Sequence, residues 1–174
     1  MTQGYLLGIG SNLSPQKNIG AIITLLLNHF SSLALSRVLH IPPVGMNSTH
    51  DFLNVVVFIE TALNAFELKV ICNDIETKLG RDRQDPASKI KDRPADLDIL
   101  CPINSEEDFL CDANTVTDEY FLYPLLEEIC HYLIQKPYST RQKGILIEVG
   151  SLTFGQSATT INRNASSSDK RIHQ

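Results

Sequence analysis

Apolar residues in the first forty positions form two short apolar runs with a helical repeat between them. The run 4–10 (GYLLGIG) is followed by turn residues, which predicts a β-strand. We predict an amphipathic helix after it, beginning at Ser14-Pro15 with Ser14 as N-cap and Pro15 at the first helical position. Its apolar residues recur at the spacing of one helix face, at Ile19, Ile22, Ile23, Leu26, Leu27 and Phe30. A second strand is expected around 33–39, before a loop that begins with two prolines.

The next elements repeat this order. Residues 52–60 (FLNVVVFIE) are β-branched and aromatic, which predicts a strand in the middle of a sheet. Asn64 and Glu67 have the spacing of a capping box, and Gly80 is a typical residue just beyond a helix end. Between them, the predicted buried face consists of Leu68, Ile71, Cys72, Ile75 and Leu79. With a strand at 96–100 (DLDIL), the order is β-α-β-β-α-β. We therefore predict an α+β, ferredoxin-like sandwich with an antiparallel sheet and both helices packed on one face.

The pattern weakens after residue 100. We expect a short helix at 123–133 and an added edge strand at 144–149. The residues from 151 onward are rich in Ser, Thr and Asn and contain few large apolar residues, so we predict a disordered tail at 151–174. The rest, 1–150, is expected to be a single domain.

Composition and charge narrow the function. The chain is 43% hydrophobic and 20% charged, as in globular proteins, and has a net charge of −5. Six basic residues lie between Lys78 and Arg93, whereas the segment 94–135 has ten acidic residues and no Lys or Arg. One short basic segment in an acidic protein argues against a nucleic-acid partner and suits a compact polyanion such as a nucleoside triphosphate.

No part of the sequence indicates a membrane or an exported protein. No apolar run approaches the length of about 20 residues that spans a bilayer. The first residues lack the basic region of a signal peptide, and the four cysteines show neither a CxxC pair nor zinc-ligand spacing. We expect a cytoplasmic protein with free thiols and no membrane partner.

Two aspartates and the preceding basic segment are the candidate chemistry. Asp96 and Asp98 are two apart on a predicted strand, so their carboxylates project from one face and offer the hard oxygen ligands that magnesium prefers. A solvent-facing pair, or Asp96 capping a turn, is the structural alternative. Basic side chains that would lie near a polyphosphate are Arg81, Arg83, Lys89, Lys91 and Arg93. A solvated basic loop balanced by its own aspartates remains open from these residues alone.

Five motifs in order resemble one family. They are Gly10-Ser11-Asn12, Pro42-Pro43-Val44-Gly45, Asp51-Phe52-Leu53-Asn54, Gly80-Arg81-x-Arg83 and Arg93-x-x-Asp96-Leu97-Asp98-Ile99. In order and spacing they resemble the 6-hydroxymethyl-7,8-dihydropterin pyrophosphokinases over residues 5–100. The resemblance implies transfer of the β,γ-pyrophosphoryl group of ATP to the hydroxymethyl oxygen of the pterin, with release of AMP, in folate biosynthesis.

The resemblance also implies roles for individual residues. Asp96 and Asp98 would hold two magnesium ions, and these two aspartates with Arg81 and Arg93 would be the catalytic residues. The ATP-binding set would be Glu76, Arg81, Arg83, Lys89, Lys91, Arg93 and Ile99. The pterin-binding set would be Val44, Gly45, Phe52, Asn54 and Tyr120. Structural alternatives are an exposed helix carboxylate for Glu76, a satisfied polar strand residue for Asn54 and core packing for Phe52.

The chain departs from the family pattern in two places. The loop between Arg83 and Arg93 is lengthened and lacks the usual tryptophan. The basic pair expected before the Pro124 helix is absent, and Thr117, Asp118 and Glu119 stand there instead. We hypothesise that Lys89 and Lys91 compensate for the absent basic pair.

The alternative functions are a paralogue that binds pterin or nucleotide with little or altered transfer, and a ferredoxin-like interaction domain. The expected partners are ATP and a pterin alcohol, bound by a monomer.

Overall fold

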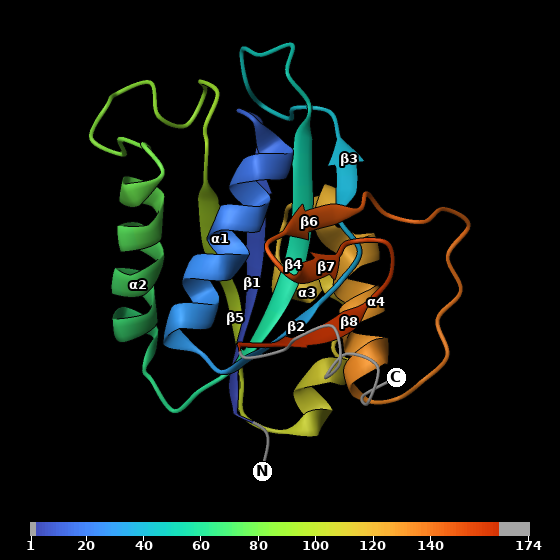
Figure 1. The fold of residues 1–174 in the computed structure, drawn as a ribbon. Coiled ribbons are helices and arrows are strands. Elements are labelled where there is room, and N and C mark those ends of the chain that lie inside the picture. The colour runs from blue at the N-terminus through green and yellow to red at the C-terminus, as the bar shows by residue number, and fades with distance from the viewer. Residues whose placement is uncertain (1–2, 164–174) are drawn as a thin grey trace.

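The fold is built around one six-stranded antiparallel sheet that is covered by helices on both faces (Figure 1). The computed structural model describes residues 3–163. Its elements are β1 (Gly4–Ser11), α1 (Pro15–His29), β2 (Ser32–Leu35), β3 (Leu39–Ile41), β4 (Phe52–Glu60), α2 (Ala65–Lys78), β5 (Asp96–Ile103), η1 (Glu106–Leu110), α3 (Ala113–Val116), η2 (Tyr120–Leu122), α4 (Tyr123–Leu133), β6 (Ile147–Val149), β7 (Leu152–Phe154) and β8 (Thr159–Asn162). The strand order is β5-β1-β4-β2-β8, and β3 also pairs with β4. The predicted α+β class, with an antiparallel sheet and helices packed on it, is confirmed.

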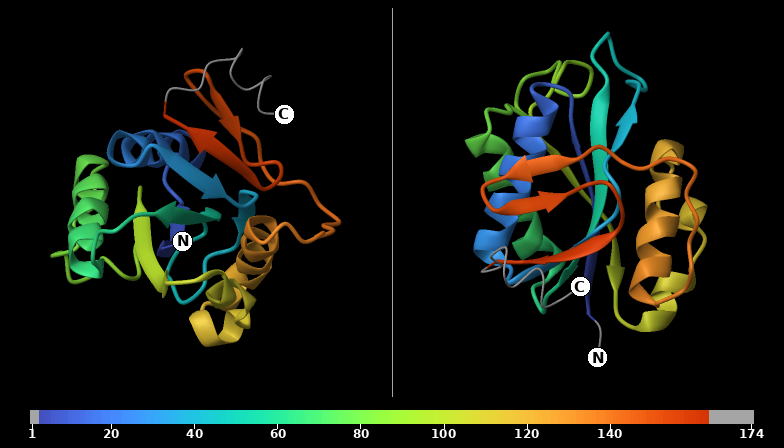
Figure 2. Two further views of the ribbon diagram at one scale, coloured as in Figure 1. Left: turned by 90° about the horizontal axis from the view of Figure 1, so that it is seen from below. Right: turned by 45° about the vertical axis from the view of Figure 1, so that its right-hand side comes forward.

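The two faces of the sheet bury two separate apolar clusters. Alternate residues of β1 point to opposite faces: Leu7 and Ile9 join the cluster under α1 and α2, whereas Leu6 joins the cluster under α4. Figure 2 shows α1 and α2 on one side of the sheet and α4 on the other. Because β4 has a helix layer on each side, all of its residues except Glu60 are buried. The prediction of two helices on one face holds for α1 and α2, and the later helices cover the opposite face.

Local sequence signals set both ends of α2. The Asn64 side chain accepts a hydrogen bond from Glu67 N, and the Glu67 side chain accepts one from Asn64 N, as the capping box predicted. At the other end Gly80 has a positive φ of 97°. The Arg81 N–H donates to Glu76 O (3.0 Å) and Gly80 N–H to Thr77 O (3.0 Å), the two bonds of a Schellman motif. This turn delivers the basic segment directly from the end of α2.

Ser14 precedes α1 as predicted, but the prediction that its side chain caps the helix is wrong. Pro15 occupies the first turn of the helix, as predicted. Ser14, however, has a positive φ of 40° and makes no side-chain capping bond. With its backbone in the left-handed region rather than the extended conformation of an N-cap, its hydroxyl does not cap the helix N–H groups.

The C-terminal segment corrects two further predictions. The tail predicted to be disordered from Ser151 contains β7 and β8; β8 pairs with β2 in the register Leu33↔Ile161. Both strands bury apolar residues, among them Phe154 and Ile161, which a polar average composition concealed. The remainder of the predicted tail, 164–174, lies outside the described residues. The edge strand predicted at 144–149 is β6, but it pairs only with β7 in a separate two-stranded sheet. The C-terminal strand that is added at one edge of the main sheet is β8.

Two expectations, the helix before residue 134 and the free cysteines, are met in the described residues. The helix predicted at 123–133 is α4, with these bounds. The four cysteines are free, and Cys72 is buried, as predicted. Within residues 3–163 no helix is both long and apolar enough to cross a membrane.

Candidate active site

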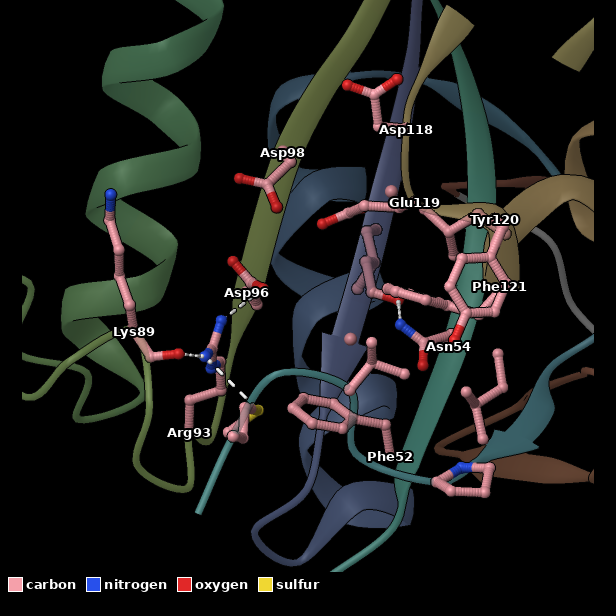
Figure 3. A pocket seen from close by; sticks show the side chains of 18 of the residues that line it. Phe52, Asn54, Lys89, Arg93, Asp96, Asp98, Asp118, Glu119, Tyr120 and Phe121 are labelled. Atoms are coloured by element: carbon pink, nitrogen blue, oxygen red, sulfur yellow. Dashed lines mark hydrogen bonds and ion pairs between the residues drawn. The ribbon is translucent and has the colours of Figure 1, made fainter. Parts of the chain in front are cut away.

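A cavity of about 420 Å³ opens at the end of the sheet where β1 ends and β5 begins (Figure 3). The residues that line it come from β1, the end of β3, the loop before β4, β4, the basic segment after α2, β5 and the segment before α4. Ten predicted site residues are among them: Val44, Phe52, Asn54, Arg81, Arg83, Lys89, Arg93, Asp96, Asp98 and Tyr120. Four predicted site residues are not in the lining: Gly45, Glu76, Lys91 and Ile99. The fold thus gathers predicted site residues that are separated in the sequence by up to 76 positions, from Val44 to Tyr120.

Strand register sets the arrangement of the cavity floor. Gly10 on β1 is paired with Asn54 on one side and Asp96 on the other, so these three positions form one row on one face of the sheet. A Cβ at Gly10 would lie 2.6 Å from Asn54 Nδ2, too close for a side chain. The glycine therefore leaves an open space between an amide and a carboxylate. Two residues earlier on β1, Gly8 is paired with Asp98, and a Cβ at Gly8 would lie 3.2 Å from Leu122 Cδ1.

Arginine side chains surround Asp96. Arg81 Nη1 lies 2.8 Å from Asp96 Oδ1, and Arg93 Nη1 lies 2.9 Å from Asp96 Oδ2. Arg83 Nη2 is 3.4 Å from the same Oδ1 and 3.8 Å from Asp98 Oδ1. Because Asp96 and Arg81 are largely buried, these charges attract strongly and hold the basic segment against β5.

Glu76 anchors two of these arginines from below the cavity. Its side chain is 2% exposed, so the alternative of an exposed helix carboxylate is wrong. Its oxygens accept hydrogen bonds from Arg83 Nε (2.5 Å), Arg83 Nη2 (2.7 Å) and Leu97 N (2.8 Å), and Arg81 Nη1 lies 3.5 Å away. The bonds to Glu76 raise the pKa of Arg83. In this structure Glu76 positions arginines and does not face the cavity.

Two further acidic residues line the cavity, and sequence reasoning did not place them there. Asp118 and Glu119 occupy the segment where the family carries basic residues, and both are in the lining. Burial, and then the nearby Asp96, raises the pKa of Glu119. Burial, followed by Asp96 and Glu119, raises the pKa of Asp98. This part of the cavity is therefore rich in carboxylates, and their adjacency to Tyr120 was the available sequence signal.

The opposite part of the cavity is apolar and less constrained. Asn54 is 8% exposed, and its side-chain nitrogen lies 3.4 Å from Ile9 O. Its Oδ1 is one of three buried side-chain atoms without a hydrogen-bond partner among residues 3–163; the others are Arg81 Nε and Arg93 Nε. The Phe52 ring lies 5.8 Å from the Arg93 guanidinium carbon, and Tyr120 is 63% exposed. An unpaired buried amide oxygen beside two aromatic rings suits a flat ligand that carries hydrogen-bond donors.

The two lysines of the lengthened loop have different environments. Lys89 lines the cavity, and its carbonyl accepts a hydrogen bond from Arg93 Nη2 (2.5 Å) (Figure 3). Lys91 Nζ instead pairs with Asp85 Oδ2 (2.5 Å) at the surface. The compensation hypothesis thus rests on Lys89 in this structure.

The carboxylates of Asp96 and Asp98 fit a hard divalent cation. They lie on one face of β5 and both line the cavity. Among residues 3–163 no set of three or more His, Cys, Asp or Glu side chains is arranged to hold a metal by itself. Two carboxylates with the remaining positions open to phosphate and water is the arrangement in which magnesium is usually bound with a nucleotide.

Comparison with known proteins identifies one family, the pyrophosphokinases that the sequence motifs resemble. The family model of 7,8-dihydro-6-hydroxymethylpterin-pyrophosphokinase matches residues 6–130. A 2-amino-4-hydroxy-6-hydroxymethyldihydropteridine pyrophosphokinase from Bacillus subtilis (strain 168) is 31% identical over 150 residues, which cover 81% of this chain and 87% of the relative. A protein of the same name from Porphyromonas gingivalis (strain ATCC 33277) is 35% identical over 96 residues, which cover 54% of this chain and 65% of the relative.

Proposed function

The chain belongs to the 7,8-dihydro-6-hydroxymethylpterin-pyrophosphokinase family, and we propose that it transfers pyrophosphate from ATP to the hydroxymethyl group of 6-hydroxymethyl-7,8-dihydropterin in folate biosynthesis. The observation that carries this proposal is that one cavity has two unlike ends. One end has arginines and aspartates suited to a polyphosphate and its cation. The other has an amide oxygen without a hydrogen-bond partner among residues 3–163, and aromatic rings, which suit a pterin. Gly10 leaves the space between them in which the two substrates would meet.

The charged end is assigned to ATP. Arg81, Arg83 and Arg93 would exchange part of their contact with Asp96 for phosphate oxygens and stabilise the charge that develops during transfer. Lys89 would add a point charge at the rim. Asp96 and Asp98 would hold magnesium, with two ions expected, and bound magnesium would neutralise phosphate charge. Asp96 is then available as a ligand only when the arginines have anionic partners in the nucleotide.

The less charged end is assigned to the pterin. Asn54 Oδ1 would accept a hydrogen bond from an N–H group of the ring, and Phe52 and Tyr120 would stack on its faces. Val44 would contact the ring from the loop before β4. The hydroxymethyl oxygen would attack the β-phosphorus of ATP, the bond from that phosphorus to the oxygen of AMP would break, and the hydroxyl proton would leave. The products are the pterin pyrophosphate and AMP.

We also propose that the core of the fold has the ferredoxin-like topology. The strands β1, β2, β4 and β5, with α1 and α2, follow the chain order β-α-β-β-α-β and have the sheet order β5-β1-β4-β2, which supports a ferredoxin-like core. The strands β3, β6, β7 and β8 and the helices after β5 are then additions. A monomer that works in the cytoplasm remains our expectation.

The proposed function is tested by AMP release. The protein, ATP and magnesium are incubated with and without 6-hydroxymethyl-7,8-dihydropterin, and we expect AMP that depends on the pterin. Asp98→Asn keeps the shape of the side chain but removes a charge, and should lower the rate by about 100-fold or more. Asp74→Asn, which alters an exposed ion pair on α2, is the matched control and should retain the rate. Folded protein that binds both ligands and releases no AMP would overturn transfer in favour of a binding paralogue.

A further inference from the structure

Two loops form the rim of the cavity, and they serve its two ends. The loop 42–51, between β3 and β4, brings Val44 and Met46 into the lining. The loop 81–95, between α2 and β5, brings the arginines and Lys89. If the proposed function is correct, one loop contacts the pterin and the other contacts ATP.

A group of polar side chains joins the two loops outside the reacting end of the cavity. We call Asn12, Ser48, His50 and Asp92 the Asp92 cluster. Asp92 Oδ1 accepts hydrogen bonds from the Ser48 hydroxyl and from Asn12 Nδ2 (2.9 Å), and His50 Nδ1 lies 2.7 Å from Asp92 Oδ2. The bond from Ser48, then those from His50 and Asn12, lower the pKa of Asp92. None of these four side chains lines the cavity, so the proposed chemistry does not use them.

The Asp92 cluster also fixes the backbone of Arg93. Asn12 is 3% exposed, and its Oδ1 accepts a hydrogen bond from Arg93 N (2.7 Å), while Asn12 N donates to Arg93 O (3.1 Å). From this backbone position the Arg93 guanidinium reaches Asp96 and the Met46 sulfur at 3.5 Å (Figure 3). Arg93 therefore touches both loops and the aspartate of the proposed cation site.

A second acidic residue of the same loop, Asp85, does not bridge the two loops. Asp85 accepts a hydrogen bond from Ala87 N (2.9 Å) and pairs with Lys91. Both partners belong to its own loop. The side-chain partners of Asp92 all lie outside its loop. Asn12 is in the turn after β1, and Ser48 and His50 are in the loop 42–51.

We propose that Asp92 is a positioning residue that couples the pterin and ATP sites, because it holds the loop 42–51, the loop 81–95 and Arg93 in one arrangement. A ligand that orders one loop also orders the other through this residue, so the second ligand binds to loops that are already ordered. Coupling between two sites is reciprocal: ATP tightens pterin binding by the factor by which the pterin tightens ATP binding. This inference rests on the proposed function.

The coupling is measured by binding, without turnover. Pterin affinity is determined by titration with and without magnesium and α,β-methylene-ATP, whose modified bond is the one that would break. The ratio of the two dissociation constants is the coupling. We expect a ratio of about 5-fold or more for the unmodified protein, within the usual range for coupled sites, and below about 2-fold for Asp92→Ala. The variant should still bind each ligand singly.

Three variants separate positioning from general damage. Asp92→Asn keeps an acceptor for Ser48 and Asn12 and should restore most of the ratio. Ser48→Ala combined with His50→Ala removes the side-chain contacts of the loop 42–51 with Asp92 without altering the loop 81–95. It should lower the ratio as Asp92→Ala does. Asp85→Ala is the matched control and should keep the ratio.

The outcomes distinguish this inference from the proposed function. An unchanged ratio in Asp92→Ala and in the double variant, or no coupling in the unmodified protein, overturns the role of Asp92. A protein that binds neither ligand overturns the proposed function instead. An Asp85→Ala variant that loses the ratio as fully as Asp92→Ala would also overturn the proposal, because any disturbance of the loop would then suffice.

Discussion

The two ends of the cavity are built in different ways. At the charged end Arg81, Arg83 and Asp96 are tied to one another and to the buried Glu76. At the end that we assign to the pterin, called the pterin end below, the Asn54 side chain makes one long hydrogen bond. Its Oδ1 has no hydrogen-bond partner among residues 3–163, and Tyr120 is largely exposed. The charged end is thus part of the folded interior, whereas at the pterin end Asn54 and Tyr120 make few side-chain contacts within the fold. Substitutions at the charged end should cost stability as well as function, and those at the pterin end should cost binding alone.

The largest effect is expected where the charged end is anchored. Glu76→Ala removes the partner of two arginines and of Leu97 N, and leaves the buried Arg81 with less compensation. Breaking a buried ion pair costs about 3–5 kcal/mol, and we expect that loss in the free energy of unfolding, measured by urea denaturation. Asp74→Ala on the exposed face of α2 is the matched control, with a loss below about 1 kcal/mol. Equal stability of the two variants would show that the charged end is not part of the structural core.

An intermediate effect, on binding and not on stability, is expected at the pterin end. Asn54→Ala removes the acceptor assigned to the pterin ring, and a lost hydrogen bond of this kind weakens binding by about 1–3 kcal/mol. The one hydrogen bond that its side chain makes within the described residues is the 3.4 Å contact with Ile9 O, so the free energy of unfolding should change much less. Fluorescence titration with the pterin, with the ATP analogue as the control ligand, measures the effect. A loss of stability with unchanged pterin affinity would mean that Asn54 is a structural strand residue.

The same contrast explains which features were predictable from sequence. Local chemistry specifies the capping box of Asn64 and Glu67, the turn at Gly80 and the shared face of Asp96 and Asp98, and each was predicted. The role of Glu76 was missed although a signal existed. It follows Cys72 by four positions on the buried face of α2, and a carboxylate on such a face needs a buried partner.

Other features depend on contacts between distant segments. β8 forms because Ile161 pairs with Leu33, and nothing in the local sequence of a Ser- and Thr-rich segment indicates that pairing. Similarly, no local periodicity determines whether Asp118 and Glu119 face the cavity or the solvent, because they lie in a non-helical segment that is placed by the helix after it. Sequence reasoning therefore reached the residues of the charged end more reliably than the segment before α4.

The smallest effect is expected at Glu119, which lies between the two ends. The folded state raises the pKa of this carboxyl, first through burial and then through Asp96. A raised pKa means that folding favours the protonated form of the carboxyl. The stability that Glu119 contributes is therefore fully present below the ordinary carboxyl pKa, and it is lost as the pH rises through the raised pKa of the folded state. Glu119→Gln, which cannot ionise, should match the unmodified protein at pH 4 and exceed it at pH 8 by up to about 1 kcal/mol in the free energy of unfolding. Asp112→Asn, an exposed substitution outside the cavity, should show no such divergence between the two pH values. If Glu119→Gln is the less stable protein at pH 8, Glu119 is held by a favourable contact with Arg93, and the segment before α4 belongs to the charged end after all.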